Sequence, residues 1–182
     1  MIESALHFLQ AHSQYLLLTI FFVAFCESLA VVGIVVPGVG LLAAMSVLAG
    51  QLEVSMYWLL MSATLGAIAG DGLSYWIGKL FQDRLNHIWP FKSHPHWIHD
   101  GQRFFKKYGG ISIFIGRFIG PIRPIIPLVA GMMKMDGLSF LKWNVISALC
   151  WAPVYLLPGY FLGEQLEIKW LTSWQGLLVL LL

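Results

Sequence analysis

The sequence predicts an all-α integral membrane protein built from two inverted repeats, each a re-entrant helical hairpin followed by a transmembrane helix. The first observation is composition: the 182 residues are 58% hydrophobic and 11% charged, with a mean hydropathy of +0.76, whereas soluble domains carry about 25% charged residues. The second is that two apolar segments are interrupted by proline and glycine, and each precedes an apolar segment long enough to cross a bilayer. The third is charge. The net charge of +2 is small and its cations are concentrated in one region, so we expect no nucleic-acid partner.

The first interrupted segment covers residues 15–50. Its apolar run from Tyr15 to Val36 is long enough to cross a bilayer, but it contains Glu27 and leads into Pro37 and Gly38 before a shorter apolar run resumes. Because proline ends or kinks a helix, we expect a helix, a break at Pro37 and Gly38, and a half-helix that returns to the starting side. Non-helical backbone at membrane depth needs surrounding protein or a water-filled cavity.

The second interrupted segment, residues 111–134, repeats this pattern. Three prolines break it, at Pro121, Pro124 and Pro127. Its last apolar piece ends in Ala-Gly at Gly131, as the first hairpin does at Gly50. A long span follows each hairpin, at about 57–80 and about 138–162, and bends are expected at Pro153 and Pro158 in the second. Paired broken segments are typical of transporters with a site near mid-membrane.

Charge predicts the orientation of the two repeats. If both hairpins are re-entrant, one side of the membrane receives eight cations: Lys79, Arg84, Lys92, Arg103, Lys106, Lys107, Lys134 and Lys142. The other side receives Lys169 alone. The positive-inside rule makes the first side, with the basic loop 79–107, the cytoplasm. We expect residues 1–14 to form an interfacial segment that is not a cleaved signal peptide, and residues 164–182 to begin a C-terminal transmembrane helix too short for a full crossing.

The basic loop contains a predicted amphipathic helix at about 94–108. Ser93 is expected to cap it, Pro95 to lie in its first turn, and Gly109 to stop it. Its aromatic residues recur on one face and its cations on the other, which predicts a helix lying in the membrane interface. A metal site is an alternative for its three histidines, His94, His96 and His99. We expect no metal and no other cofactor, because no cysteine or carboxylate cluster lies at ligand spacing.

Four ionisable residues fall inside predicted membrane segments: Glu27, Asp71, Arg117 and Arg123. Each would cost about 2.5 to 3.5 kcal/mol at the bilayer centre, and together they would rival the stability of a whole domain. They must therefore face the protein interior or a wet cavity. One interpretation is two structural salt bridges, for which we pair Arg117 with Asp71 and Arg123 with Glu27; the crossed pairing is the alternative. Because buried ion pairs stabilise a fold less well than apolar packing, we favour a functional role.

Small residues recur every fourth position along the span 57–80, at Ser62, Gly66, Gly70, Ser74 and Gly78. Such a ridge lets another helix or hairpin pack closely. Asp71 lies on the flank of the ridge, and Tyr75 lies one turn further along. Packing accounts for the glycines of the ridge but not for the carboxylate.

Four stretches resemble, in order, motifs of the DedA family, also called the VTT or SNARE-associated Golgi protein family. They are "FCESLAVVGIVVPGVGLL", "GAIAGDGLSYWIGKLFQ", "FIGRFIGPIRPIIPLVAGMMKM" and "FLKWNVISALCWAPVYLLPGYFLG", the last with an Asn-to-Trp spacing that begins at Asn144. The resemblance covers about residues 15–163. It implies two re-entrant hairpins and movement of lipids across membranes, in bacterial members the recycling of undecaprenyl phosphate and in eukaryotic relatives phospholipid scrambling. The family's acidic pair corresponds to Glu27 and Asp71, and its arginine pair to Arg117 and Arg123.

The resemblance and these residues together imply a lipid flippase of the bacterial inner membrane, with proton coupling, and not an enzyme. Arg117 and Arg123 would hold the lipid phosphate through planar, bidentate guanidinium groups, helped by half-helix N-termini, while Glu27 and Asp71 would carry protons. The expected partners are membrane lipids, an anionic phosphate headgroup and protons. A homo-oligomer is left open, as is the appended lipid phosphatase domain that some relatives carry.

Three alternatives stay under consideration. A proton-dependent small-cation or drug antiporter would use the same acids, but the two arginines oppose a cationic substrate. A general phospholipid scramblase would also have to recognise a phosphate headgroup, as the predicted flippase does. A lipid phosphatase would need a nucleophile and a base, and no histidine lies in the membrane segments.

Overall fold

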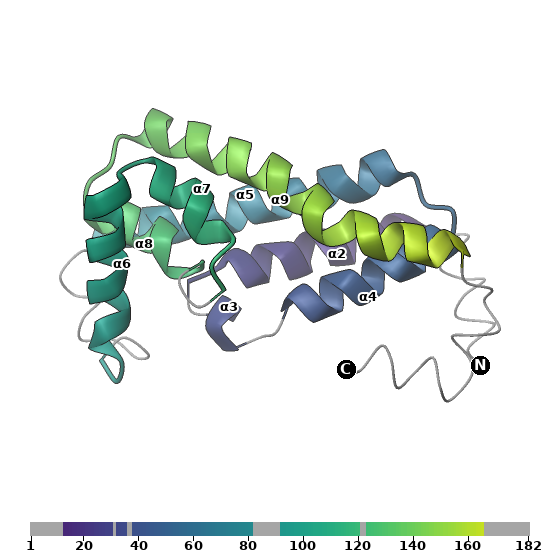
Figure 1. Cartoon of the computed structure of the whole chain (residues 1–182), viewed down its shortest axis with the longest axis horizontal. Helices are drawn as coiled ribbons and strands as arrows, with labels where there is room; N and C mark the ends of the chain where they lie inside the picture. The colour runs from purple at the N-terminus through teal and green to yellow at the C-terminus, as the bar shows by residue number, and fades with distance from the viewer. Residues whose placement is uncertain (1–12, 31, 36–37, 82–91, 121–122, 166–182) are drawn as a thin grey trace.

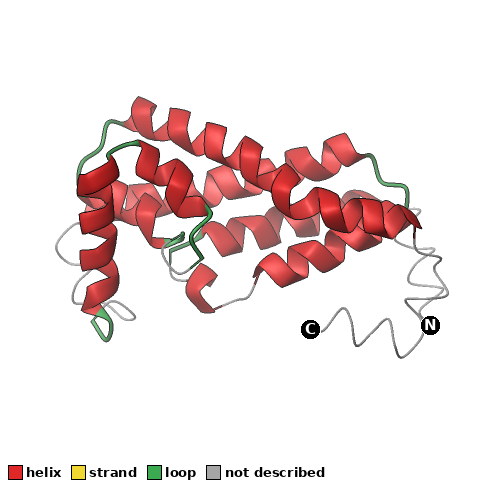
Figure 2. Cartoon of the chain, viewed as in Figure 1, coloured by secondary structure: helices red, strands yellow, loops and turns green. Residues whose placement is uncertain are grey.

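The computed structural model describes residues 13–30, 32–35, 38–81, 92–120 and 123–165, and every regular element in these ranges is a helix (Figure 2). Figure 1 shows their arrangement. The helices are α2 (Ser13–Ser28), α3 (Val32–Val35), α4 (Gly38–Gln51), α5 (Met56–Phe81), α6 (Pro95–Tyr108), α7 (Ile111–Arg117), α8 (Ile125–Met132) and α9 (Gly137–Gln165). The all-helical fold class is thereby confirmed.

Two long helices, α5 and α9, contact each other and carry the shorter ones. Helices α2 and α8 pack on α5, whereas α4 and α7 pack on α9. Each long helix therefore packs against one helix of the first broken segment and one helix of the second. Among the described helices, α9 alone is both long and apolar enough to cross a membrane, judged by length and composition. Helix α5 has 26 residues, which at 1.5 Å per residue reach about 39 Å.

Helix α2 ends earlier than the sequence indicates. A helix from Tyr15 to Val36 is wrong, because α2 stops at Ser28 and the short α3 follows. The cause lies on α5: the hydroxyl of Ser74 donates to the carbonyl oxygen of Ser28 at 3.2 Å and accepts from the backbone N–H of Ala30 at 3.0 Å. This side chain replaces the backbone bonds that a continuing helix would supply. Pro37 lies outside the described residues, and Gly38 is the first residue of α4.

The ridge of small residues on α5 packs as predicted. A Cβ atom at Gly66 would overlap the carbonyl oxygen of Phe21, and one at Gly70 would overlap that of Phe25, both on α2. Further along the helix, a Cβ at Gly78 would overlap the carbonyl oxygen of Leu128 on α8. The glycines thus let the backbones of α2 and α8 lie directly against α5, which confirms the packing role of the ridge.

The predicted helix at about 94–108 is confirmed as α6, but its cap is not Ser93. The N-cap is His94, with φ −134°, and no side chain caps it. Pro95 occupies the first helical position, and a residue before proline is kept out of the helical region, so His94 must be the boundary and Ser93 lies one residue too early. The helix ends at Gly109, whose φ of 58° suits glycine, as predicted.

The second broken segment forms α7 and α8, which contact each other. Pro124 directly precedes α8 and Pro127 lies in its first turn, where a missing N–H costs no intrahelical bond. Pro121 lies outside the described residues. Gly131, near the end of α8, packs its backbone against the carbonyl oxygen of Tyr75 on α5.

Helix α9 begins with a side-chain cap. The carboxylate of Asp136 accepts a hydrogen bond from the backbone N–H of Ser139 at 2.9 Å, and this bond holds the pKa of Asp136 below its usual value. Pro153 and Pro158 lie inside the helix, and Figure 1 shows its axis bending along its length.

Two turns at the ends of α4 and α8 match each other closely. Glu53 has φ 52° and Lys134 has φ 56°, and each follows a helix that ends near an Ala-Gly pair. The residue after each of them accepts a hydrogen bond from a buried tyrosine: the hydroxyl of Tyr160 donates to Val54 at 2.8 Å, and that of Tyr75 donates to Met135 at 2.6 Å. Each tyrosine lies in a Tyr-x-x-Gly sequence on a long helix, so the correspondence extends to side chains.

The apolar core is divided along the long helices. One cluster of buried residues includes Ala67 of α5 and Trp151 of α9, together with residues of α2 and α4. Another includes Tyr75 of α5 and Phe140 of α9, together with residues of α7 and α8. Polar buried residues lie between the two clusters on both long helices, and they form the site.

Candidate functional site

The four ionisable residues expected inside the membrane are buried and close together. Glu27 lies at the end of α2, Asp71 in the middle of α5, Arg117 at the end of α7, and Arg123 just before α8. Their exposed fractions lie between 3% and 7%. The sequence places these residues on separate segments, and folding brings them to one region because both broken segments turn there.

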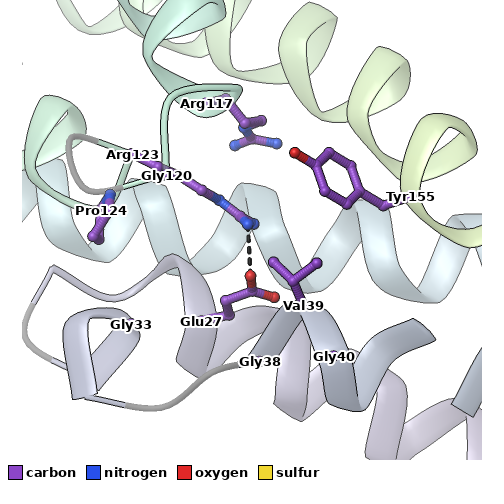
Figure 3. Close-up of a pocket in the computed structure, with 10 residues that line it drawn as sticks. All are labelled: Glu27, Gly33, Gly38, Val39, Gly40, Arg117, Gly120, Arg123, Pro124 and Tyr155. Atoms are coloured by element: carbon purple, nitrogen blue, oxygen red, sulfur yellow. Dashed lines mark hydrogen bonds and ion pairs between the residues drawn. The ribbon is translucent and has the colours of Figure 1, made fainter. Parts of the chain in front are cut away.

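The charges are joined in two ion pairs. Nη1 of Arg123 donates to Oε1 of Glu27 at 2.6 Å, the contact that is drawn dashed in Figure 3. Nη2 of Arg117 pairs with Oδ2 of Asp71. The pairing assumed from the sequence is confirmed. One pair joins α2 to the segment before α8, and the other joins α5 to α7.

Asn144 of α9 fixes the orientation of Arg117. Its side-chain oxygen accepts a hydrogen bond from Nη2 of Arg117 at 2.8 Å, and its side-chain nitrogen donates to the carbonyl oxygen of Ile68 on α5 at 3.1 Å. The side chain is fully buried. Asn144 is expected, from its place in the fourth DedA-like stretch, to pack helices, whereas the structure places it directly on the guanidinium of Arg117.

Two aromatic residues of α9 complete the surroundings of the arginines. The guanidinium carbon of Arg123 lies 4.4 Å from the ring centroid of Trp151, within the range of a cation–π interaction. The hydroxyl of Tyr155 points toward Arg117 (Figure 3). Sequence reasoning assigned no role to either residue. Their spacing from Asn144, seven and eleven residues, keeps all three on one face of a helix and is the signal that could have found them.

Each ion pair leaves buried polar atoms without a hydrogen-bond partner among the described residues. These atoms are Nη1 of Arg117, Nη2 of Arg123 and Oε2 of Glu27. A buried polar group without a partner costs about 1 to 3 kcal/mol, and more when it is charged. Buried donors of this kind call for a partner, which a ligand or an ordered water can supply.

A cavity of about 300 Å³ lies at these groups (Figure 3). Arg117, Arg123, Glu27 and Tyr155 supply its polar lining. Four glycines also line it: Gly33, Gly38, Gly40 and Gly120. The volume is at the lower end of the range for small-molecule pockets, about 300 to 1,000 Å³. Two guanidinium groups with spare donors make the cavity suited to a small oxyanion.

Other residues singled out from the sequence lie away from the cavity. Tyr75 stacks on Phe140 at 4.2 Å between ring centroids and closes the turn at Met135. His94 stacks on Trp97 at 4.3 Å. No group of three or more histidine, cysteine, aspartate or glutamate side chains that could hold a metal occurs in the described part of the chain.

The described residues form a helical fold with a small, charge-paired cavity between two broken segments. Residues 36–161 match the model of the VTT domain. The chain is 36% identical over 163 residues to the inner membrane protein YabI of Escherichia coli, covering 89% of this chain and 64% of that protein. It is 35% identical over 155 residues to the protein DedA of Escherichia coli, covering 79% of this chain and 67% of that protein. The chain therefore belongs to the DedA family of VTT-domain membrane proteins.

Further relatives are named only as membrane proteins. An uncharacterized membrane protein of Buchnera aphidicola is 36% identical over 154 residues, covering 85% of this chain and 60% of that protein. The chain spans between 58% and 64% of the length of four curated relatives, YabI of Escherichia coli and three membrane proteins of Buchnera aphidicola. No solved structure matches the chain.

Proposed function

We propose that this chain is a flippase that moves a polyprenyl-phosphate carrier lipid, of the undecaprenyl phosphate type, across the bacterial inner membrane. The observation that carries the proposal is the pair of spare donors on Arg117 and Arg123, which are buried at one cavity. A phosphate headgroup that leaves the membrane surface needs fixed donors to replace its hydration, and guanidinium groups match phosphate oxygens in a planar fork. The role that the resemblance implies for bacterial DedA proteins points the same way.

The balance of donors and acceptors favours an anion over a cation. The described residues leave two guanidinium nitrogens unpartnered and one carboxylate oxygen, Oε2 of Glu27. A cation at that oxygen would lie beside Arg123, which Coulomb repulsion opposes. A cation or drug antiporter is therefore the weaker candidate. The proposal assigns no catalytic residue and no nucleic-acid partner to the site.

Charge balance motivates proton coupling. With two carboxylates and two guanidinium groups the empty site is neutral, so a phosphate dianion would leave two uncompensated negative charges in a buried cavity. Such charges cost several kcal/mol each. Protons taken up by Glu27 and Asp71 would restore neutrality and release both guanidinium groups to the headgroup. Lipid movement and proton movement would then occur together.

The membrane arrangement that we propose is a pair of inverted repeats, α2 to α5 and α7 to α9, each with a re-entrant hairpin. At 1.5 Å per residue the 16 residues of α2 span about 24 Å and the 14 of α4 about 21 Å. Both lengths are below the hydrocarbon thickness of about 30 Å. The matched turns at Glu53 and Lys134 support the repeat, since each follows the returning helix of one hairpin. A substrate site where two broken segments meet is typical of transporters with such repeats.

The test measures lipid binding by native mass spectrometry on the purified full chain. We expect wild type to bind undecaprenyl phosphate, and Arg117→Lys and Arg123→Lys each to weaken that binding at least tenfold although both keep the charge, because lysine cannot make the bidentate contact. Arg103→Lys, an exposed cation on α6, is the matched control and should bind as wild type does.

Undecaprenol, which has the same chain without the phosphate, reports binding that depends on the tail alone. Equal binding of undecaprenol and undecaprenyl phosphate by wild type would contradict the proposal. Equal binding and equal movement of phosphatidylglycerol would instead support a general phospholipid scramblase.

A further inference from the structure

The four glycines that line the cavity fall into two kinds. A Cβ at Gly33 would overlap the carbonyl oxygen of Glu27, and a Cβ at Gly38 would lie within 3.0 Å of the Glu27 side chain. These two positions are glycine because Glu27 needs the space. Gly40 and Gly120 differ, because a Cβ at either would meet no heavy atom of the described residues within 4 Å, chain neighbours aside.

Backbone conformation does not account for Gly40 and Gly120 either. Among the described glycines the left-handed φ occurs at Gly109, so neither position requires glycine for its geometry. Gly40 lies in the first turn of α4, and glycine within a helix is about 1 kcal/mol less favourable than alanine. Neither packing nor geometry therefore explains them. Both glycines line the cavity, and a Cβ at either would have open space around it.

Their position distinguishes them from the charged residues. Gly40 and Gly120 are exposed, whereas Arg117 and Arg123 are buried. The lining of the cavity thus has a buried, charged part, the floor, formed by Glu27, Arg117 and Arg123, and an exposed part, here called the opening, that includes Gly40 of α4 and Gly120 of the segment after α7. Figure 3 labels both sets of residues. A phosphate ester bound at the floor must pass its ester-linked carbon chain out through this opening.

We propose that Gly40 and Gly120 are specificity-determining residues that keep the opening wide enough for the ester-linked chain of a phosphate-bearing lipid. The inference rests on the proposed function, because it assumes that the floor binds phosphate. A side chain at either position narrows the opening and acts on the chain that follows the phosphate. Inorganic phosphate has no such chain, so its binding at the floor is unaffected.

The experiment compares two ligands on the full chain in detergent, by isothermal titration calorimetry. The ligands are inorganic phosphate and farnesyl phosphate, a short prenyl phosphate. Gly40→Leu and Gly120→Leu are expected to lower the affinity for farnesyl phosphate at least tenfold and to leave that for inorganic phosphate within threefold. Gly40→Ala and Gly120→Ala should show a smaller loss in the same direction. Gly72→Ala is the matched control, because Gly72 on α5 also has open space within 4 Å but does not line the cavity.

Results other than the expected one separate failure of the glycine role from failure of the proposed function. If wild type binds both ligands and the leucine variants bind farnesyl phosphate as wild type does, the role of the two glycines is overturned and the phosphate site stands. If wild type binds inorganic phosphate but not farnesyl phosphate, the cavity is a site for free phosphate, and the glycine role and the flippase both fail. If wild type binds neither, the proposed function is lost as well.

Stability provides the second readout. Alanine at Gly40 or Gly120 has room, so both alanine variants should melt within a few degrees of Gly72→Ala. If either alanine variant unfolds or melts far below that control, the space beside the glycine is not open, and the proposal is overturned.

Discussion

Arg123 and Glu27 are 96 residues apart in the chain and form a buried ion pair, with Nη1 of the arginine 2.6 Å from Oε1 of the glutamate. The pair is only half satisfied, because Nη2 of Arg123 and Oε2 of Glu27 have no hydrogen-bond partner among the described residues. If every donor and acceptor of the pair had a hydrogen-bond partner, a structural role alone would account for it. In the proposed function, this spare donor would bind the headgroup and this spare acceptor would take up the proton.

The first prediction separates structural from functional roles of this pair. Arg123→Ala should lower the free energy of unfolding by about 3 to 5 kcal/mol, because it leaves Glu27 buried without its partner. The double variant Arg123→Ala/Glu27→Ala should recover most of that stability, as measured by thermal unfolding in detergent. It should not recover binding of undecaprenyl phosphate, because the donor is absent.

Arg117→Ala/Asp71→Ala is the parallel double variant, and Arg123→Ala/Asp71→Ala is the crossed control, which should not regain stability because it keeps Glu27 and Arg117 without their partners. Full recovery of lipid binding and flipping by either parallel double would show that the arginines serve only as structural partners of the acids.

The second prediction concerns energy coupling. Glu27→Gln and Asp71→Asn keep the size of each side chain but cannot take up and release a proton. Both should fold and bind lipid, and both should lose the dependence of flipping on a pH gradient in proteoliposomes. If both variants respond to the gradient as wild type does, these carboxylates do not carry the coupled proton.

The third prediction concerns Trp151, whose ring centroid lies 4.4 Å from the guanidinium carbon of Arg123. A cation–π contact at a desolvated site contributes about 2 kcal/mol, equivalent to roughly thirtyfold in affinity. Trp151→Leu should therefore weaken lipid binding by roughly 5- to 30-fold, while Trp151→Phe, which keeps a ring, should retain most of it. Trp58→Leu changes an exposed tryptophan of α5 and serves as the control. If the phenylalanine and leucine variants lose affinity equally, the ring does not position Arg123.

The sequence was sufficient to predict features that follow from residue spacing along one helix or from the cost of burying a single charge. The small-residue ridge of α5 follows from a repeat of four, and the cost of unpaired charge in a membrane requires partners for Arg117 and Asp71. Interactions between distant segments were not predictable in this way. The end of α2 at Ser28 depends on Ser74, 46 residues away, and no feature of α2 itself indicates it.

The aromatic residues beside the two arginines were missed for a related reason. Trp151 and Tyr155 lie in a continuous apolar span, where aromatic residues ordinarily pack against other helices or lipid. Their role becomes visible only when α9 is placed beside Arg117 and Arg123. The same holds for Gly40 and Gly120, because an open space beside a glycine cannot be read from the chain.

The fourth prediction tests orientation in the membrane. The turn at Glu53, between α4 and α5, and the start of α6 lie at opposite ends of the molecule (Figure 1). In a chain whose Cys26 and Cys150 are replaced by alanine, Glu53→Cys should react with a membrane-impermeant maleimide added outside intact cells. Lys92→Cys, just before α6, should react only after the membrane is opened. Labelling of both positions from the same side would rule out the inverted arrangement.

The fifth prediction tests the equivalence of the two repeats through their tyrosine contacts. The hydroxyl of Tyr75 donates to the carbonyl oxygen of Met135 at 2.6 Å, and that of Tyr160 donates to Val54 at 2.8 Å. Both tyrosines are 6% exposed. Tyr75→Phe and Tyr160→Phe each remove one hydrogen bond and leave a carbonyl oxygen without that partner, so each should lower the free energy of unfolding by about 1 to 3 kcal/mol.

If the repeats are equivalent, the two losses should be similar in size and should add in the double variant, because the contacts share no partner. Thermal unfolding in detergent measures them, and Tyr57→Phe, which changes an exposed tyrosine at the start of α5, is the matched control. Lipid binding should stay within threefold of wild type, because neither tyrosine lines the cavity. A large loss of unfolding free energy for one variant and none for the other would mean that the two turns share a backbone geometry, but that their tyrosine hydrogen bonds do not stabilise the fold equally. The inverted-repeat proposal would then lose its support from side-chain contacts and rest on helix length and on the backbone geometry of the turns at Glu53 and Lys134.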